Sequence, residues 1–265
     1  MKLDDWAYRG NKYFYDRKLK ELAGRMPLEK WGFNEADEYS VLRNYLFHTF
    51  DKLWEEREDV PEVSKAYYIY EDDHQACFNT GLFDNKGQCL YFYCELNPNP
   101  LQKWRFKTFF NSYTIQQTDI PAKVAQNLKR PNYFKNPADL IYNINLNIVP
   151  QWDHILDNTD NYQRIPKEIR ENGKDFTQGS ISWAIQKTQK KIIANYKTVV
   201  PQWYEHKIQL LAPLYLTNEE NPDLALVLSL NNDSSQYLGH TCLTIEMAYN
   251  NARLIAKPDS QWLYI

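Results

Sequence analysis

Glycine is scarce in this sequence: only 8 of the 265 residues are Gly, about 3% against roughly 7% in an average protein. The glycine-rich phosphate loops GxGxxG and GxxxxGKS or GxxxxGKT do not occur. The GxSxG, HExxH and EF-hand patterns are absent as well. These absences exclude collagen-like and Gly/Ser-linker chains and the best-known nucleotide, hydrolase and metal motifs. We expect no metal site and no cofactor.

Long apolar runs and an excess of basic charge are also absent. No run approaches the roughly 20 apolar residues that a membrane-spanning helix needs, and the N-terminus has no apolar signal core. The 31 Lys and Arg residues face 34 Asp and Glu residues, and the pI is near 6.0. This balance excludes a generally cationic nucleic-acid binder but not a local basic stripe. We expect a cytoplasmic protein without membrane contact and leave the oligomeric state and any protein partner open.

Cysteine is rare too, with 4 residues. No Cys or His pair has the spacing of a zinc site, and an extended strand would point Cys89 and Cys94 to opposite faces. Buried free thiols are the expected state, because a catalytic thiolate needs a neighbouring base.

Aromatic residues and asparagine are abundant instead. The chain is 15% aromatic and 43% hydrophobic with a net charge of -3, which excludes intrinsic disorder, and it has 24 Asn. Apolar residues recur at helical spacing over 37–58 and from 176 to about 196. The stretches 66–110 and 208–246 read as strands joined by short turns. We predict an α+β fold, with mostly antiparallel sheets packed with a long helix in the C-terminal half and an N-terminal helical segment.

The domain organisation follows from the same change of pattern. We expect a helical N-terminal extension over residues 1–62 and a single α+β domain over residues 63–265. No internal repeat is evident in the sequence.

Three lysines form the first candidate binding feature. Lys187, Lys190 and Lys191 lie at i, i+3 and i+4, so their ammonium groups project from one face of the predicted helix. The stretch 176–204 contains no Asp or Glu. Such a face suits a phosphate backbone, although a solvated helix face is the simpler interpretation.

Amide and guanidinium side chains form the second candidate feature. Asn250, Asn251 and Arg253 follow a strand, and Asn195 and Gln202 flank the entry to another. Arg binds phosphate or carboxylate through two parallel hydrogen bonds, and Asn or Gln can read a base edge or a peptide group. Bracing of neighbouring loops is the alternative role for these residues. Asn79 and Thr80, beside a glycine turn, are further candidates for binding a ligand or the backbone.

His154 is the best general acid or base in the sequence, because imidazole titrates near neutral pH. Arg164 follows it and, with Arg253, would stabilise phosphate charge in an enzyme. A structural role for a lone His beside a Trp is the alternative.

Several blocks together resemble the bacterial family known as domain of unknown function 3825. The resemblance covers roughly residues 65–265, and its C-terminal block, LTIEMAYNNARLI, is the most specific. The blocks are 78–82, 153–166, 195–202, 209–214, 223–227 and 243–255. Members of this family can sit beside nucleic-acid-binding modules such as cold-shock domains, so the resemblance implies RNA or nucleotide work without naming a reaction.

Three functions are compatible with these observations. The first is an RNA-binding or nucleotide-binding protein with a polar Asn/Gln/Arg pocket and the Lys-rich helix for phosphates. The second is a metal-independent hydrolase or transferase acting on RNA or a nucleotide phosphoester, with His154, Arg164 and Arg253 as catalytic residues. The third is a scaffold whose aromatic residues anchor protein partners.

Overall fold

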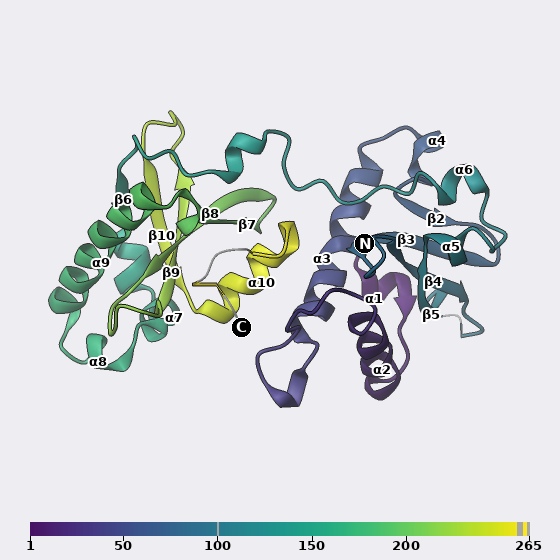
Figure 1. Cartoon of the computed structure of the whole chain (residues 1–265), viewed down its shortest axis with the longest axis horizontal. Coiled ribbons are helices and arrows are strands. Elements are labelled where there is room, and N and C mark those ends of the chain that lie inside the picture. The colour runs from purple at the N-terminus through teal and green to yellow at the C-terminus, as the bar shows by residue number, and fades with distance from the viewer. Residues whose placement is uncertain (100, 259–261, 264–265) are drawn as a thin grey trace. The chain divides into compact units, whose positions relative to one another are not determined.

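The computed structural model describes residues 1–99, 101–258 and 262–263, and it confirms the α+β fold class. The chain divides into two compact units, Met1–Asn132 and Tyr133–Ile265 (Figure 1). Each unit holds one five-stranded sheet. The boundary between the units therefore falls after Asn132, and the helices before residue 62 belong to the same unit as the first sheet.

Unit 1 begins mainly with helices, and most strands of its sheet follow in its middle (Figure 1). They are α1 (Leu3–Trp6), β1 (Ala7–Tyr8), α2 (Lys12–Ala23), η1 (Glu35–Asp37), α3 (Ser40–Glu58), α4 (Glu62–Lys65), β2 (Ile69–Glu71), β3 (Gln75–Phe83), β4 (Cys89–Leu96), β5 (Trp104–Asn111), α5 (Ser112–Ile115) and α6 (Ala122–Ala125). The strand order is β1-β5-β4-β3-β2, and β1 runs parallel to β5.

An aromatic cluster joins the N-terminal helices to the sheet of unit 1. Phe78, Phe92 and Phe106 stand on three neighbouring strands, with ring centroids 4.9 and 4.2 Å apart. Phe50 of α3 packs on Phe78 at 5.4 Å. Since α3 buries its apolar stripe on this cluster, the N-terminal segment is part of the core rather than an appendage.

The elements of unit 2 follow the same general plan. They are η2 (Pro137–Leu140), β6 (Ile148–Pro150), the π-helical turn η3 (Asp153–Asp157), α7 (Thr159–Arg164), α8 (Lys167–Arg170), α9 (Lys174–Ala194), η4 (Tyr196–Thr198), β7 (Val200–Tyr204), β8 (Lys207–Leu214), β9 (Leu224–Leu230), β10 (Tyr237–Leu243) and α10 (Ile245–Ile255). The strand order is β6-β10-β9-β8-β7, and β6 runs parallel to β10.

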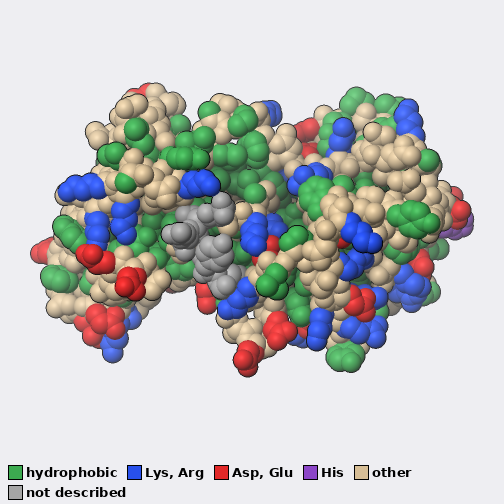
Figure 2. Space-filling model, in the orientation of Figure 1, with side chains coloured by type: hydrophobic (Ala, Val, Ile, Leu, Met, Phe, Trp, Pro, Cys, Tyr) green, Lys and Arg blue, Asp and Glu red, His purple; other side chains and the backbone are tan. Residues whose placement is uncertain are grey.

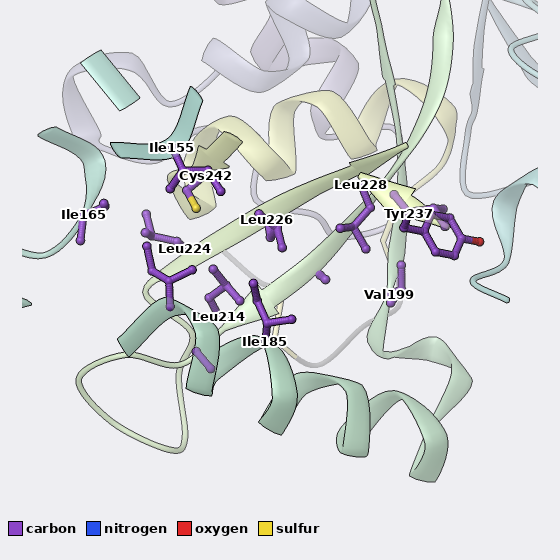
Figure 3. Packing of buried hydrophobic residues seen from close by; sticks show 14 of the residues in the cluster. Ile155, Ile165, Ile185, Val199, Leu214, Leu224, Leu226, Leu228, Tyr237 and Cys242 are labelled. Atoms are coloured by element: carbon purple, nitrogen blue, oxygen red, sulfur yellow. The ribbon is translucent and has the colours of Figure 1, made fainter. Parts of the chain in front are cut away.

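The sheet of unit 2 lies between two helices. Leu214, Leu226 and Leu228 face the buried side of α9, and Figure 3 shows these side chains packed with Ile185. Because side chains alternate along a strand, the residues next to these leucines point to the opposite face of the sheet. That second face is where α10 packs on β7.

The two sheets share one topology. In each unit a short first strand is followed by helices and then by a four-stranded antiparallel meander, and the first strand pairs in parallel with the last strand of the meander. The last strand also carries an extra residue opposite its neighbour in both units, near Lys107 in β5 and between Gly239 and Cys242 in β10. The structure therefore contains a repeat of topology.

In the part of the chain that the structure describes, no helix combines the length and the apolar character needed to cross a bilayer.

Candidate functional site

Two of the sequence blocks singled out above meet in unit 2. The helix α10 begins at the N-cap Thr244, whose Oγ1 accepts a hydrogen bond from the Met247 amide at 3.3 Å. Its buried face packs on β7, and Asn251 Nδ2 donates to Gln202 Oε1 at 3.1 Å. The blocks 195–202 and 248–255 are therefore neighbours in space, as the hypothesis of a shared pocket requires.

Gln202 forms the centre of a short amide ladder. Its side chain is only 1% exposed, and its Nε2 donates to Gln209 Oε1 at 2.8 Å while its Oε1 accepts from Asn251. A buried amide needs such partners, and here they come from the fold itself. Gln202 and Asn251 thus tie α10 to the sheet.

The amide ladder gives a first prediction. Gln202→Leu keeps the volume but leaves the polar groups of Gln209 and Asn251 without their partner, so we expect the free energy of unfolding to fall by about 1–3 kcal/mol. Urea denaturation measures the change. Gln209→Leu, at a less buried position, is the matched control and should cost less. An unchanged midpoint for Gln202→Leu would show that the ladder does not hold α10.

A hollow of about 300 Å³ opens beside the ladder, and we call it the α10 hollow. It lies among η2, η4, β7 and the C-terminal end of α10. Its apolar lining residues include Leu140, Ile141, Val199, Val200, Pro201 and Ile255, and its polar lining residues are Tyr196, Lys197 and Lys257. The backbone here is fixed locally, since exposed Asn195 accepts from the Lys197 amide at 3.1 Å and Trp262 Nε1 donates to the Thr198 carbonyl at 2.6 Å.

Asn250 and Arg253 occupy other faces of α10. Asn250 Nδ2 donates to the Glu246 carbonyl at 3.2 Å, and its buried Oδ1 has no hydrogen-bond partner among the described residues. Arg253 is 7% exposed in the last turn of α10. Arg253 is therefore held inside unit 2, whereas Asn250 is half-buried.

The three lysines of α9 do not act as one group. Lys187 Nζ pairs with Glu219 Oε1 at 2.7 Å, and Lys191 Nζ lies 3.4 Å from the centre of the Tyr215 ring. Burial lowers the pKa of Lys191, and the charge of Lys187 lowers it further. Lys190 is exposed. The stretch 176–204 lacks an acid, and the loop between β8 and β9 supplies one through Glu219. The face in view in Figure 2 has Lys and Arg side chains with Asp and Glu close by.

His154 and Arg164 lie near β10 in unit 2. His154 is exposed in η3, where its carbonyl accepts from Asn161 Nδ2 at 2.8 Å. Arg164 donates from its guanidinium to the Cys242 carbonyl at 3.1 Å. Burial raises the pKa of the Cys242 thiol to about 12, so this cysteine stays protonated. Arg164 therefore braces the sheet.

Sequence reasoning missed His240, a second histidine of unit 2. His240 on β10 forms a hydrogen bond through Nε2 with the Ser229 hydroxyl on β9. Burial lowers the pKa of His240, and the charges of His154 and Lys207 lower it further. The one available signal was the alternation of Leu228 and Ser229 along a strand, which puts a polar residue on the face opposite the core.

Asn79 and Thr80 belong to unit 1 and are buried there. Asn79 Nδ2 donates to the Leu128 carbonyl at 3.1 Å, and its Oδ1 accepts from the Gly81 amide at 2.9 Å. Thr80 Oγ1 donates to the Leu90 carbonyl at 2.6 Å. Gly81 has a φ of 75°, so this pair shapes a bulged strand that needs glycine.

The residues of this site lie within a stretch of the chain that matches a known protein family. The sequence model of the family described as Domain of unknown function (DUF3825) matches residues 22–262. The chain belongs to the DUF3825 family. The match reaches further toward the N-terminus than the resemblance over residues 65–265 and includes most of unit 1 together with unit 2. No curated protein and no solved structure matches this DUF3825 chain.

Proposed function

We propose that unit 2 binds a nucleotide, free or as part of single-stranded RNA, in the α10 hollow. The observation that carries this proposal is the meeting of the blocks 195–202 and 248–255 around one open, mostly apolar space with lysines on its lining. Sites for small molecules have this character, with apolar walls, a few polar groups and volumes that start near 300 Å³. We also propose the cytoplasm as the location.

The chemistry of the lining fits the parts of a nucleotide. Tyr196 is 64% exposed and offers a ring on which a base can stack. The aliphatic walls, including Val200 and Ile255, suit the faces and edges of the base. Lys197 and Lys257 are exposed at this site and can approach a phosphate group.

The dependence of binding on salt separates these lysines from those of α9. Fluorescence anisotropy with labelled single-stranded RNA gives the slope of log K against log salt concentration. We expect the double variant Lys197→Gln and Lys257→Gln to reduce the magnitude of that slope by about 1.4, because each phosphate contact on a single strand contributes about 0.7.

The matched control carries Lys187→Gln, Lys190→Gln and Lys191→Gln. It should change the slope less, since Glu219 already neutralises Lys187. If the salt dependence of RNA binding fell in the α9 variant and stayed unchanged in the Lys197 and Lys257 variant, the RNA phosphates would contact α9 instead. If wild-type protein bound neither RNA nor mononucleotides in a thermal-shift screen, the proposed function would be wrong.

A further inference from the structure

One face of the β9–β10 pair carries a cluster of proton-transfer groups. Gly239 and Tyr237 face the core, and a Cβ at Gly239 would lie 3.2 Å from Leu226. Ser229 alternates with buried Leu228 and so points away from that core, toward the same side as His240. The hydrogen bond between the Ser229 hydroxyl and His240 Nε2 fixes the imidazole ring on this face.

The parallel strand β6 brings His154 to the same place. Pro150 of β6 pairs with Gly239, and the Gln151 amide donates to the Gly239 carbonyl at 2.8 Å. The turn η3 follows at once and packs against β10. The exposed His154 of η3 therefore lies close to Gly239, the residue that precedes His240.

Lys207 adds a basic side chain to this cluster. It opens β8 and lies two residues before Gln209, so both side chains belong to the same face of the strand. Leu210 pairs with Leu228 in the antiparallel register of β8 and β9, so the next pair along places Gln209 opposite Ser229. The elements packed against β10 carry further charged residues. They are Asp153 and Asp157 of η3, Asp160 and Arg164 of α7, and Glu246 and Arg253 of α10. Arg164 donates to the Cys242 carbonyl.

We propose that His154, His240 and Lys207 cleave the phosphodiester backbone of RNA by general acid and base catalysis. This inference rests on the proposed function, because it supplies a reaction for an RNA bound by unit 2. It adds His240 and Lys207 to the single histidine that the sequence suggested.

The step balances with the RNA alone as reactant. With Ser229 accepting from Nε2–H, the neutral His240 takes the ribose 2′-hydroxyl proton on Nδ1, and the 2′-oxygen attacks the adjacent phosphorus. The bond from phosphorus to the 5′-oxygen breaks as the imidazolium of His154 donates its proton to that oxygen. The products are a 2′,3′-cyclic phosphate and a 5′-hydroxyl, and Lys207 stabilises the negative charge on the phosphoryl oxygens.

The environment assigns the two roles. The base must be neutral to accept a proton, and the partial burial of His240 lowers its pKa, as does the proximity of His154 and Lys207. His154 is exposed, so its ring can approach a leaving group. Paired titratable groups in unlike environments are the usual arrangement for an acid and a base.

The test uses the full chain and a fluorogenic DNA oligonucleotide with a single ribonucleotide, in a buffer with EDTA. We expect cleavage at the ribonucleotide with a 2′,3′-cyclic phosphate end detected by mass spectrometry. His154→Ala and His240→Ala should each lose about a hundredfold or more in kcat, as general acid or base catalysis contributes 10²–10⁴-fold. His74→Ala, at an exposed histidine of unit 1, is the matched control and should keep full activity.

The pH profile adds a readout that misfolding would not reproduce. Because the pKa of His240 is lowered, the acidic limb of kcat should lie below pH 6.5, the ordinary value for His. Lys207→Gln removes one cause of that shift and should move the limb to higher pH. Ser229→Ala should lower kcat more than it changes KM, and Ser229→Thr should restore it.

Binding is measured separately with 2′-O-methyl RNA, which lacks the attacking hydroxyl. RNA that binds in the α10 hollow but is not cleaved would overturn this inference and leave the proposed function standing. Cleavage that survives in both histidine variants, or that proceeds on all-DNA, would overturn it as well. If the wild-type protein bound neither 2′-O-methyl RNA nor mononucleotides, the proposed function would be overturned.

Discussion

We expect Glu71→Ala to lower the free energy of unfolding of unit 1 by about 3 kcal/mol, the largest effect on stability that we predict for a partly exposed residue. Glu71 Oε1 accepts from the indole N–H groups of Trp6 and Trp104 at 2.9 and 2.7 Å. Its Oε2 pairs with the Arg57 guanidinium at 3.0 Å. One carboxylate thus satisfies three donors from β5, α3 and the segment before β1.

The cost arises from the donors that remain after the substitution. Trp104 is fully buried and Trp6 is 3% exposed, so neither indole N–H can turn to water. A buried donor without a partner costs about 1–3 kcal/mol, and the unpaired Arg57 adds to this. Glu71→Gln keeps an acceptor for the two indole N–H groups but replaces the oxygen that pairs with Arg57 by an NH2 donor, so it should cost less than Glu71→Ala.

Urea denaturation followed by tryptophan fluorescence measures both variants. A further control, Glu62→Ala, removes an exposed carboxylate that pairs with Lys65 at 3.1 Å, and we expect a change within about 0.5 kcal/mol. If Glu71→Ala and Glu62→Ala behaved alike, the carboxylate would not organise the core of unit 1.

The helices and the long strands of this protein could be predicted from side-chain periodicity. The stripe of Leu42, Leu46 and Phe50 marks α3, and Ile181, Ile185 and Ile192 mark α9, because each buries one face on a sheet. The short parallel strands β1 and β6 carry no such signal. They have two and three residues and depend on partners about a hundred residues away in the chain.

The division of the chain after Asn132 could not be predicted from local sequence patterns. The expected boundary near residue 62 follows a real change from helical to strand pattern, but packing ignores it: Phe50 before that boundary and Phe78 after it share one core. The repeated topology was hidden for a similar reason. One sheet is filled with Phe and Tyr and the other with Leu, so equivalent positions carry different residues.

The candidate site was predictable in part. Asn251 and Gln202 are polar residues inside apolar blocks, and that contrast identified two segments that meet in the structure. The role of these amides was not predictable, because partners such as Gln209 are set by strand register. The distribution of charge around α9 was unpredictable for the same reason, since Glu219 lies 32 positions from Lys187 in the chain.

Ala256→Trp tests the α10 hollow directly, and we expect it to weaken nucleotide or RNA binding about a hundredfold, or about 2.8 kcal/mol. Ala256 is exposed, follows the last turn of α10 in an extended conformation with φ of −162°, and lines the hollow. An indole at this position occupies the space that a base would fill. Because the position is exposed, the free energy of unfolding should change by no more than about 0.5 kcal/mol.

The matched control for this variant is Ala122→Trp, which adds the same exposed indole to the start of α6 in unit 1. Ala256→Ser keeps the hollow open and should bind like the wild type. Fluorescence anisotropy with RNA and thermal shift with mononucleotides give the affinities, and urea denaturation gives the stability. A stable Ala256→Trp protein with wild-type affinity would exclude the α10 hollow as the binding site, because the indole would occupy the space that the base needs.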